Sequence, residues 1–467
     1  MAPGVAPSSG PARPWDRRRF IALGGAAVTL LGAGAQEEAE AALPDDLGEG
    51  RDALERLDSP YWERIRRKYF ALRRDEVYVN NSTFGATLEP VRRRMEEVQE
   101  LFSAGCDVDR YVSSIVLSLR PMREAVARVV NSPLPAGAGI GNADSATEGI
   151  SLVANGLPIS RGDVVLVTDH EHTGNRTPWE LQRDRRGATL VKVPLLLPGE
   201  KEAAWKRALL ERFREALAPG DVRVVSFPWI TCSTGHVLPA KEICALAATY
   251  GAVSVVDAAQ AFAVLPVDVV DLDCDFLVAN GHKYLCGPIG SGFVCIHPRL
   301  LQDPASFWAT VVDDNYYHPD VPARNYPHRK GGVAPFTNVL PLLEALEFFE
   351  ALEPERVHAR LSLIGGWLRA FLSAFPDRFE LLTPRSRALS AVVTCFRMAT
   401  GTPSSEEIAK RLTQEYGIHA KWATEGGADA VRLSPHYYTT SRELFAVARA
   451  LCEIAGVDRR GWEGATR

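Results

Sequence analysis

The sequence predicts an α/β fold in which a large domain with a mostly parallel sheet is followed by a smaller C-terminal α/β domain. Between about residues 120 and 300, helical patterns alternate with short valine-rich strands such as VVLVTD, RVVSFPW and VSVVDAA. Such alternation is typical of βαβ units, whose strands run parallel. The chain has 467 residues, of which 46% are hydrophobic, so it is long and apolar enough for two domains.

The order of the expected elements gives provisional domain limits. Residues near 52–75 and 89–104 have helical patterns and lead into the alternating region. We therefore assign residues 42–344 to an N-terminal segment and the large domain, and residues 345–467 to the small domain. The stretch at 313–332 is rich in Tyr, His, Pro and Asn without helical period, and we interpret it as a loop that covers a site rather than as an ordinary solvated loop.

The N-terminus contains an export motif. Arg17 and Arg18 precede Phe-Ile and an Ala/Gly-rich run that is too short and too weakly apolar for a stable membrane anchor. Twin arginines in this setting are typical of the twin-arginine export signal, and alternative A-x-A cleavage sites end at Ala35 and at Ala41. We expect residues 1–41 to be a signal peptide read by the twin-arginine translocation machinery, and the protein to be periplasmic or secreted. The alternative is a basic extension of a cytosolic protein.

Charge and cysteine content exclude several classes. The net charge of −5 comes from 53 basic and 58 acidic residues, and no segment has the pattern of a DNA-binding helix-turn-helix. We therefore expect no nucleic-acid partner. The eight cysteines form no CxxC pair, so we expect no metal site.

Two strand ends carry the most informative residues. The run VSVV ends in Asp257, and the run FLVA leads into Asn280-Gly281-His282-Lys283. Ligands bind at the carboxyl ends of strands in α/β sheets. A lysine there can form a Schiff base with an aldehyde cofactor, and pyridoxal phosphate needs an acidic partner for its pyridine nitrogen. The alternative is a surface lysine and an ordinary aspartate that ends a strand.

Three further sets of residues strengthen this interpretation. Ser145-Ala146-Thr147 opens a helix and leaves backbone N–H groups for a phosphate, although Ser and Thr also cap most helices. His172 follows the strand VVLV, where its ring could lie over a pyridine ring or simply face solvent. Gln260 follows Asp257 by one turn and is placed to donate to a phenolic oxygen. Arg432, in AVRLSPHYYTT, has the planar fork that binds carboxylates, although a surface role is common for any single arginine.

In this order, the motifs resemble the class V aminotransferase family of fold-type I pyridoxal-phosphate enzymes, which includes cysteine desulfurases and isopenicillin-N-epimerase-like proteins. The resemblance extends from about Tyr78 to Glu443. It implies a homodimer with pyridoxal 5'-phosphate bound to Lys283, Asp257 beside the pyridine nitrogen and His172 stacked on the ring, these three being catalytic. The implied cofactor-binding residues are Ser145, Ala146, Thr147, His172, Asp257, Gln260, Asn280, His282 and Lys283. Arg432 and Asn81 are the implied substrate-binding residues, with Arg432 holding an α-carboxylate.

The chain departs from the family pattern at several positions. Cys232 stands where relatives often have Asn, and Asn280 where Ser is common. A Gly-Thr pair of the neighbouring subunit often reaches the phosphate, but here the pair is Gly332-Val333. Desulfurases need a cysteine shortly before the carboxylate-binding arginine, and residues 417–431 contain none. The nearest upstream cysteine, Cys395, lies in an apolar strand and is expected to be buried.

We therefore expect an enzyme that acts at the Cα-amino group of an amino acid or a small peptide-derived metabolite, with transamination or a closely related oxidative deamination favoured. Epimerisation is the main alternative, and it requires a second acid or base on the face opposite Lys283, for which His172 or Tyr316-Tyr317 are candidates. C–S cleavage, and a protein that binds the cofactor without catalysis, are further alternatives.

Overall fold

A computed structural model of the chain describes residues 57–105, 117–135, 138–195, 202–302, 306–308 and 335–457. The expected signal peptide at residues 1–41, the expected cover at 313–332 and the Gly332-Val333 pair lie outside the described residues. Export and dimerisation stay predictions. Within the described ranges, no helix is both long and apolar enough to cross a membrane.

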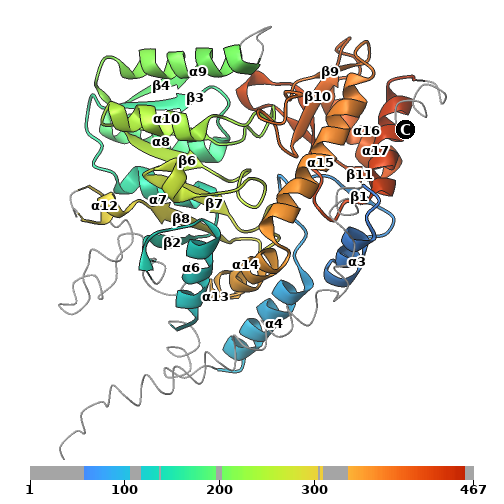
Figure 1. The fold of residues 1–467 in the computed structure, drawn as a ribbon, viewed down its shortest axis with the longest axis horizontal. Coiled ribbons are helices and arrows are strands. Elements are labelled where there is room, and N and C mark those ends of the chain that lie inside the picture. Colours follow the sequence, from blue (N-terminus) through green and yellow to red (C-terminus); the bar gives the residue numbers. More distant parts are fainter. Residues whose placement is uncertain are drawn as a thin grey trace, which may run out of the picture.

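A seven-stranded sheet forms the centre of the large domain (Figure 1), in the order β2-β8-β7-β6-β5-β3-β4. Its strands are β2 (Ile140–Ala143), β3 (Val164–Thr168), β4 (Thr189–Val193), β5 (Val222–Pro228), β6 (Val253–Asp257), β7 (Phe276–Asn280) and β8 (Gly292–Ile296). Strands β4, β3, β5, β6 and β7, neighbours in this order, pair in parallel. Strand β8 runs antiparallel to both β7 and β2. The mostly parallel α/β sheet predicted from the sequence is confirmed.

Helices cover both faces of this sheet, which explains the near-continuous apolar runs of its strands. The helices are α6 (Leu117–Val129), α7 (Ala146–Gly156), α8 (Thr173–Arg186), α9 (Glu202–Leu217), α10 (Ala240–Thr249), α11 (Val269–Leu272) and α12 (Pro298–Gln302). Successive residues of β3 enter different cores: Val165 packs with Ile150 of α7, and Leu166 packs in the cluster that includes Ile243 of α10. A Cβ at Gly149 would lie 2.5 Å from Val278, so only glycine lets α7 approach the sheet this closely.

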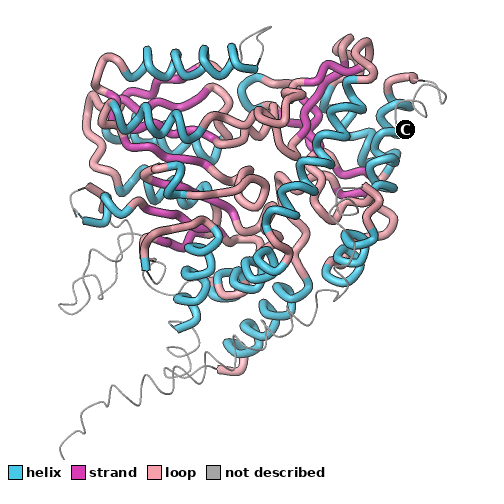
Figure 2. Tube along the Cα trace, in the orientation of Figure 1, coloured by secondary structure: helices cyan, strands magenta, loops and turns pink. Residues whose placement is uncertain are grey.

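The small domain is built on an antiparallel sheet in the order β12-β13-β10-β9. Its elements are α15 (Pro354–Ser373), β9 (Phe379–Leu381), β10 (Thr394–Met398), α16 (Ser405–Tyr416), β11 (Ile418–His419), β12 (Lys421–Ala423), the 3₁₀ turn η5 (Glu425–Gly427), β13 (Ala430–Leu433) and α17 (Ser441–Ile454). The preceding helices α13 (Phe336–Val339) and α14 (Leu342–Ala351) pack in the large core, where α14 lies against α6. Helix α15 joins the two domains (Figure 2), because Leu361 packs in the large core and Ile364 in the small one. The boundary that we set at 344/345 stays a prediction.

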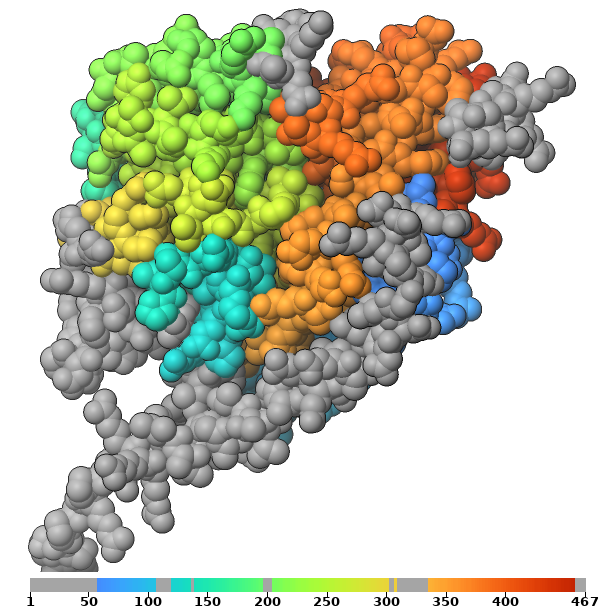
Figure 3. Space-filling model, in the orientation of Figure 1, coloured from blue at the N-terminus to red at the C-terminus, as the bar shows by residue number. Residues whose placement is uncertain are grey.

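The N-terminal segment contacts both domains. It contains α3 (Pro60–Tyr69), β1 (Val77–Tyr78) and α4 (Glu89–Ser103), and β1 pairs in parallel with β11 of the small domain. In the space-filling view (Figure 3) this segment, in blue, lies against the red C-terminal residues. Just beyond β1, the N–H of Asn81 donates to Ser434 at 3.0 Å and that of Gly85 donates to His282 at 2.7 Å. The segment therefore fastens the small domain to the loop after β7.

Gly85 allows this close approach, because a Cβ there would lie 1.9 Å from the backbone oxygen of Lys283. We expect Gly85→Ala to lower the free energy of unfolding by about 1–3 kcal/mol, the usual effect of an overpacked site. Gly366→Ala in α15 is the matched control, since its Cβ would meet nothing closer than 3.8 Å; it should be neutral or stabilise by up to about 1 kcal/mol. Urea unfolding measures both, and equal stability of the two variants would contradict the assignment.

Candidate active site

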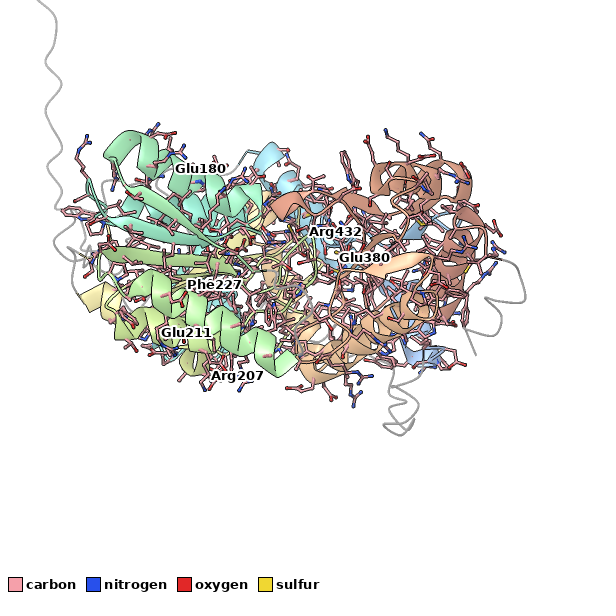
Figure 4. All side chains as sticks on the ribbon, turned by 90° about the horizontal axis from the view of Figure 1, so that it is seen from above. Glu180, Arg207, Glu211, Phe227, Glu380 and Arg432 are labelled. Atoms are coloured by element: carbon pink, nitrogen blue, oxygen red, sulfur yellow. The ribbon has the colours of Figure 1, made fainter. Side chains whose placement is uncertain are left out.

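A cavity of about 220 Å³ lies at the carboxyl ends of the parallel strands, and every predicted site residue except Asn81 lines it. Strand β6 ends in Asp257, β7 ends in Asn280, and His172 lies in the turn after β3. Arg432 reaches the cavity from β13 of the small domain, and Figure 4 shows it near the centre, where the two domains meet. The lining also includes Ser82, Thr83, Phe84, Ile150, Gly174, Pro228, Ile230, Cys232, Ala259 and Lys421.

Lys283 and Asp257 are two ionisable groups of this cavity that burial shifts in opposite directions. Burial lowers the pKa of the Lys283 ammonium to about 8; the charge of Asp257 opposes this shift, and that of Arg432 adds to it. Burial also raises the pKa of Asp257, while the N–H of Ala259, at 2.9 Å from Oδ1, and the charge of Lys283 stabilise its ionised form. A lysine with such a pKa has a substantial neutral fraction near pH 8, as nucleophilic and basic lysines require.

Aromatic packing behind Lys283 fixes its backbone. The hydroxyls of Tyr284 and Ser82 are hydrogen-bonded at 2.9 Å, and the carbonyl of Tyr284 is 3.0 Å from Nε2 of His436. The rings of Tyr284 and His436 stack with centroids 5.4 Å apart. The SPHYY segment after β13 therefore supports the lysine from the small-domain side. Sequence reasoning used this segment only as a mark of resemblance.

His172 caps the start of α8, and the capping hydrogen bond determines which ring nitrogen carries the proton. Its Nδ1 accepts the N–H of Gly174 at 3.0 Å, so the neutral ring carries its proton on Nε2. Burial lowers the pKa of His172, and the charge of Lys283 lowers it further. A neutral ring fixed in this way is suited to stacking. It is poorly suited to the alternative role of second base, because a proton on Nδ1 would break the bond to Gly174.

The start of α7 offers hydrogen-bond donors for a phosphate, but with one difference from the prediction. Ser145 caps the helix, accepting the N–H of Glu148 at 3.2 Å. The N–H of Ala146 was expected to be free for a phosphate. It instead donates to Oδ1 of Asn280 at 2.8 Å. Among the described residues, the N–H and hydroxyl of Thr147 have no partner. Thr147, the hydroxyl of Ser145 and the amide nitrogen of Asn280 are therefore donors left for a phosphate.

Two predicted cofactor contacts have specific protonation or orientation requirements. The Nδ1 of His282 lies 3.2 Å from the carbonyl of Ser291, to which it donates, and burial lowers the pKa of His282 to about 4. Its Nε2 is therefore an acceptor until a nearby anion raises the pKa and adds a proton. Gln260 donates from Nε2 to the carbonyl of Ser82 at 3.0 Å, which leaves its buried Oε1 without a partner among the described residues. The second N–H of Nε2 remains for donation to a phenolic oxygen.

Arg432 is held by neutral acceptors, which leaves its charge for a substrate. Its guanidinium donates to Thr83 at 2.8 Å, to Oδ1 of Asn80 at 3.2 Å and to the carbonyl of Cys232 at 3.3 Å. Its buried Nε has no partner among the described residues. These contacts orient the fork toward the cavity, where a carboxylate can bind it.

One predicted substrate-binding residue, Asn81, has its side chain engaged within the protein. The side-chain amide of Asn81 donates to the carbonyl of Ser434 at 2.9 Å and accepts the hydroxyl of Tyr438. Asn81 is buried between these groups and does not line the cavity. Its neighbour Asn80 instead contacts Arg432, so it is Asn80 that lies beside the carboxylate-binding group.

The thiols near the cavity are poor nucleophiles. Burial raises the pKa of both Cys232 and Cys395 to about 12, so both are protonated at neutral pH. Cys395 is fully buried, as predicted. The segment before Arg432, which forms β11, β12 and η5, contains no cysteine. Within the described residues, this segment therefore brings no thiol to the cavity.

The residues around the cavity fit pyridoxal phosphate. Lys283 supplies an amine for the aldehyde, and Asp257 supplies a carboxylate for the pyridine nitrogen. The ring of His172 supplies a stacking surface, and the start of α7 has unpaired donors for the phosphate. The buried, unpartnered oxygen of Gln260 is a further polar atom that a bound group would contact. Fold and site together define a fold-type I pyridoxal-phosphate enzyme.

Comparison with known proteins identifies the family. The model of the class V aminotransferases matches residues 87–447, so the chain belongs to this family. Isopenicillin N epimerase of Streptomyces clavuligerus is 30% identical over 351 residues, which cover 72% of this chain and 84% of the epimerase. A probable cysteine desulfurase of Methanothermobacter thermautotrophicus is 27% identical over 415 residues, covering 84% of this chain and 98% of that protein.

Solved structures show the same fold at low sequence identity. The cysteine desulfurase CsdA of Escherichia coli has a TM-score of 0.71 at 21% identity and covers 85% of this chain and 98% of its own. A C-DES mutant with glycine covalently linked to its pyridoxal-phosphate cofactor has a TM-score of 0.72 at 22% identity, covering 83% of this chain and 99% of its own. These likenesses show the fold, while the family assignment supports the cofactor predicted from the sequence.

The depressed pKa of Lys283 predicts the pH dependence of cofactor capture. The neutral amine attacks the aldehyde, so capture of pyridoxal phosphate by apoenzyme should accelerate with pH and level off above about pH 8. Asp257 raises the pKa of Lys283, so Asp257→Asn should move the plateau to lower pH. Stopped-flow absorbance measures the rate, and Glu406→Gln, on the exposed side of α16, is the control. A plateau only above about pH 10, as for lysine in solvent, would contradict the assignment.

Proposed function

We propose that this protein catalyses an amino-group reaction at Cα of an amino acid or a small peptide-derived metabolite, with transamination as the reaction. The observation that carries the proposal is the placement of Lys283 and Arg432 on the wall of one cavity. No carboxylate of the described residues forms an ion pair with Arg432, so its guanidinium is available to a substrate carboxylate. Lys283 is an amine whose pKa burial lowers to about 8. An α-amino acid has its carboxylate and its acidic Cα–H one bond apart, which such a pair matches.

The residues divide the work as follows. Arg432 binds the α-carboxylate and so orients the Cα–H bond. Pyridoxal phosphate, when bound, supplies the electron sink for the pair left at Cα. The Lys283 amine takes the Cα proton, because it is tethered in the cavity and about half of it is neutral near pH 8. Asp257 supplies the negative charge that favours a proton on a pyridine nitrogen. His172 stays neutral, because burial and the charge of Lys283 lower its pKa, and it offers its ring as a stacking surface.

Transamination needs a single base, which Lys283 provides, and this favours it over epimerisation. Inversion at Cα needs a second acid or base on the opposite face. The Nδ1 of His172 already accepts the N–H of Gly174, which disfavours that residue. Epimerisation remains the second candidate because isopenicillin N epimerases are among the relatives. Tyr316 and Tyr317, the other predicted candidates, lie outside the described residues.

An assay in deuterium oxide distinguishes transamination from epimerisation. We expect purified holoenzyme, offered a panel of amino acids and small peptides with a keto acid, to give a new keto product and an aminated acceptor. Lys283→Ala should give neither, while Lys410→Ala, an exposed lysine on α16, should match wild type. Mass spectrometry and chiral chromatography identify the products. Inverted substrate that carries deuterium at Cα, without any keto product, would show an epimerase instead.

A further inference from the structure

Two cations lie directly opposite each other on the small-domain wall of the cavity. In the antiparallel pair of β12 and β13, Lys421 is the register partner of Arg432. Directly opposed residues point to the same face of a sheet, with Cβ atoms about 4.5–5.5 Å apart. Both side chains line the cavity, so both positive groups are presented to the same bound molecule.

This pairing is unfavourable for the protein alone. Like charges directly opposite one another destabilise a strand pair. Among the described residues, neither Lys421 nor Arg432 forms an ion pair within 4 Å, and Lys421 has no hydrogen-bond partner. Conflicts of this kind between local stability and the fold are expected at functional sites. Two unneutralised cations on one wall indicate that the ligand supplies the negative charges.

Glu425, in η5, is the acid that acts on this pair from a distance. Burial alone would raise its pKa, but its own backbone N–H and the charges of Arg432 and Lys421 lower it. Glu425 is therefore ionised, yet it bonds to neither cation. A single carboxylate at this distance offsets part of the repulsion and leaves both cations available. The described wall still has a net positive charge toward the cavity.

We propose that Lys421 determines specificity by binding a second anionic group, so that the substrates are acidic amino acids or peptides whose reacting residue has a side-chain carboxylate. This rests on the proposed function in one respect, the assignment of the α-carboxylate to Arg432. The planar fork of Arg432 matches the fixed geometry of an α-carboxylate. The flexible stem and point charge of Lys421 match a distal carboxylate whose position varies with chain length.

Binding of unreactive ligands tests this without turnover. Glutarate has two carboxylates. Its monoamide, glutaramate, has the same shape but only one carboxylate. Calorimetry on holoenzyme should give glutarate a dissociation constant about fivefold lower than that of glutaramate, the scale of a partly exposed ion pair. In Lys421→Gln the ratio should fall to near one with glutaramate unchanged. Lys421→Arg should keep the preference. Lys410→Gln, with the same charge change on the exposed side of α16, should match wild type.

Two results would overturn the proposal. Equal affinity of wild type for the two ligands would show that no second cation acts on them. Equal weakening of both ligands in Lys421→Gln would show that Lys421 shares the α-carboxylate with Arg432. Circular dichroism and bound-cofactor absorbance of each variant establish that it is folded and loaded. Because the ratio is measured without reaction, it is independent of whether the product assay shows transamination, epimerisation or neither.

Discussion

The burial of one amine organises this protein. An ammonium group away from water is costly unless it is paired, so a fully buried lysine either loses its proton or acquires a partner. Lys283 does both in part: Asp257 stabilises its charge, while burial and Arg432 lower its pKa to about 8. The sheet delivers Asp257 and the lysine loop to one edge, since β6 and β7 are parallel neighbours. A reactive amine is the direct consequence of this packing.

The small domain completes the site rather than forming one of its own. It contributes Arg432 and Lys421 from adjacent strands, and the turn with Glu425 that lies beside them. Residues 79–85 form backbone hydrogen bonds with Ser434, directly after β13, and with His282, directly before Lys283. These bonds set the position of Arg432 relative to Lys283. The substrate-binding charges and the reacting amine are therefore held in one fixed relation.

The sequence was sufficient for the sheet and for the central pair because each rests on a short-range signal. Apolar runs that end in a polar residue mark buried strand ends, and this located Asp257 and Lys283. Contacts between distant segments have no such signal. Neighbouring residues near the end of an extended segment project to different sides, so Asn80 and Asn81 could not be distinguished. Lys421 stands in a polar stretch, and only its register with β13 reveals that it faces the cavity.

The hydrogen-bond partners of the site residues could not be predicted from the sequence either, for a related reason. The N–H of Ala146 was expected to be free at the start of α7, but Asn280, far away in the sequence, accepts it. The tautomer of His172 likewise depends on a bond within its own turn that residue identity does not specify. In both cases the residue type indicated a role near the cofactor, while the actual donor or acceptor depends on three-dimensional packing.

The central claim is that Lys283 is the lysine joined to pyridoxal phosphate, and a second lysine in the same cavity makes the test discriminating. Borohydride reduction of purified holoenzyme, followed by proteolysis and peptide mass spectrometry, locates the phosphopyridoxyl group. The account predicts this group on the peptide that contains Lys283, and its loss in Lys283→Ala with Lys421 intact. A reduced adduct on Lys421 or on any other lysine would contradict the account.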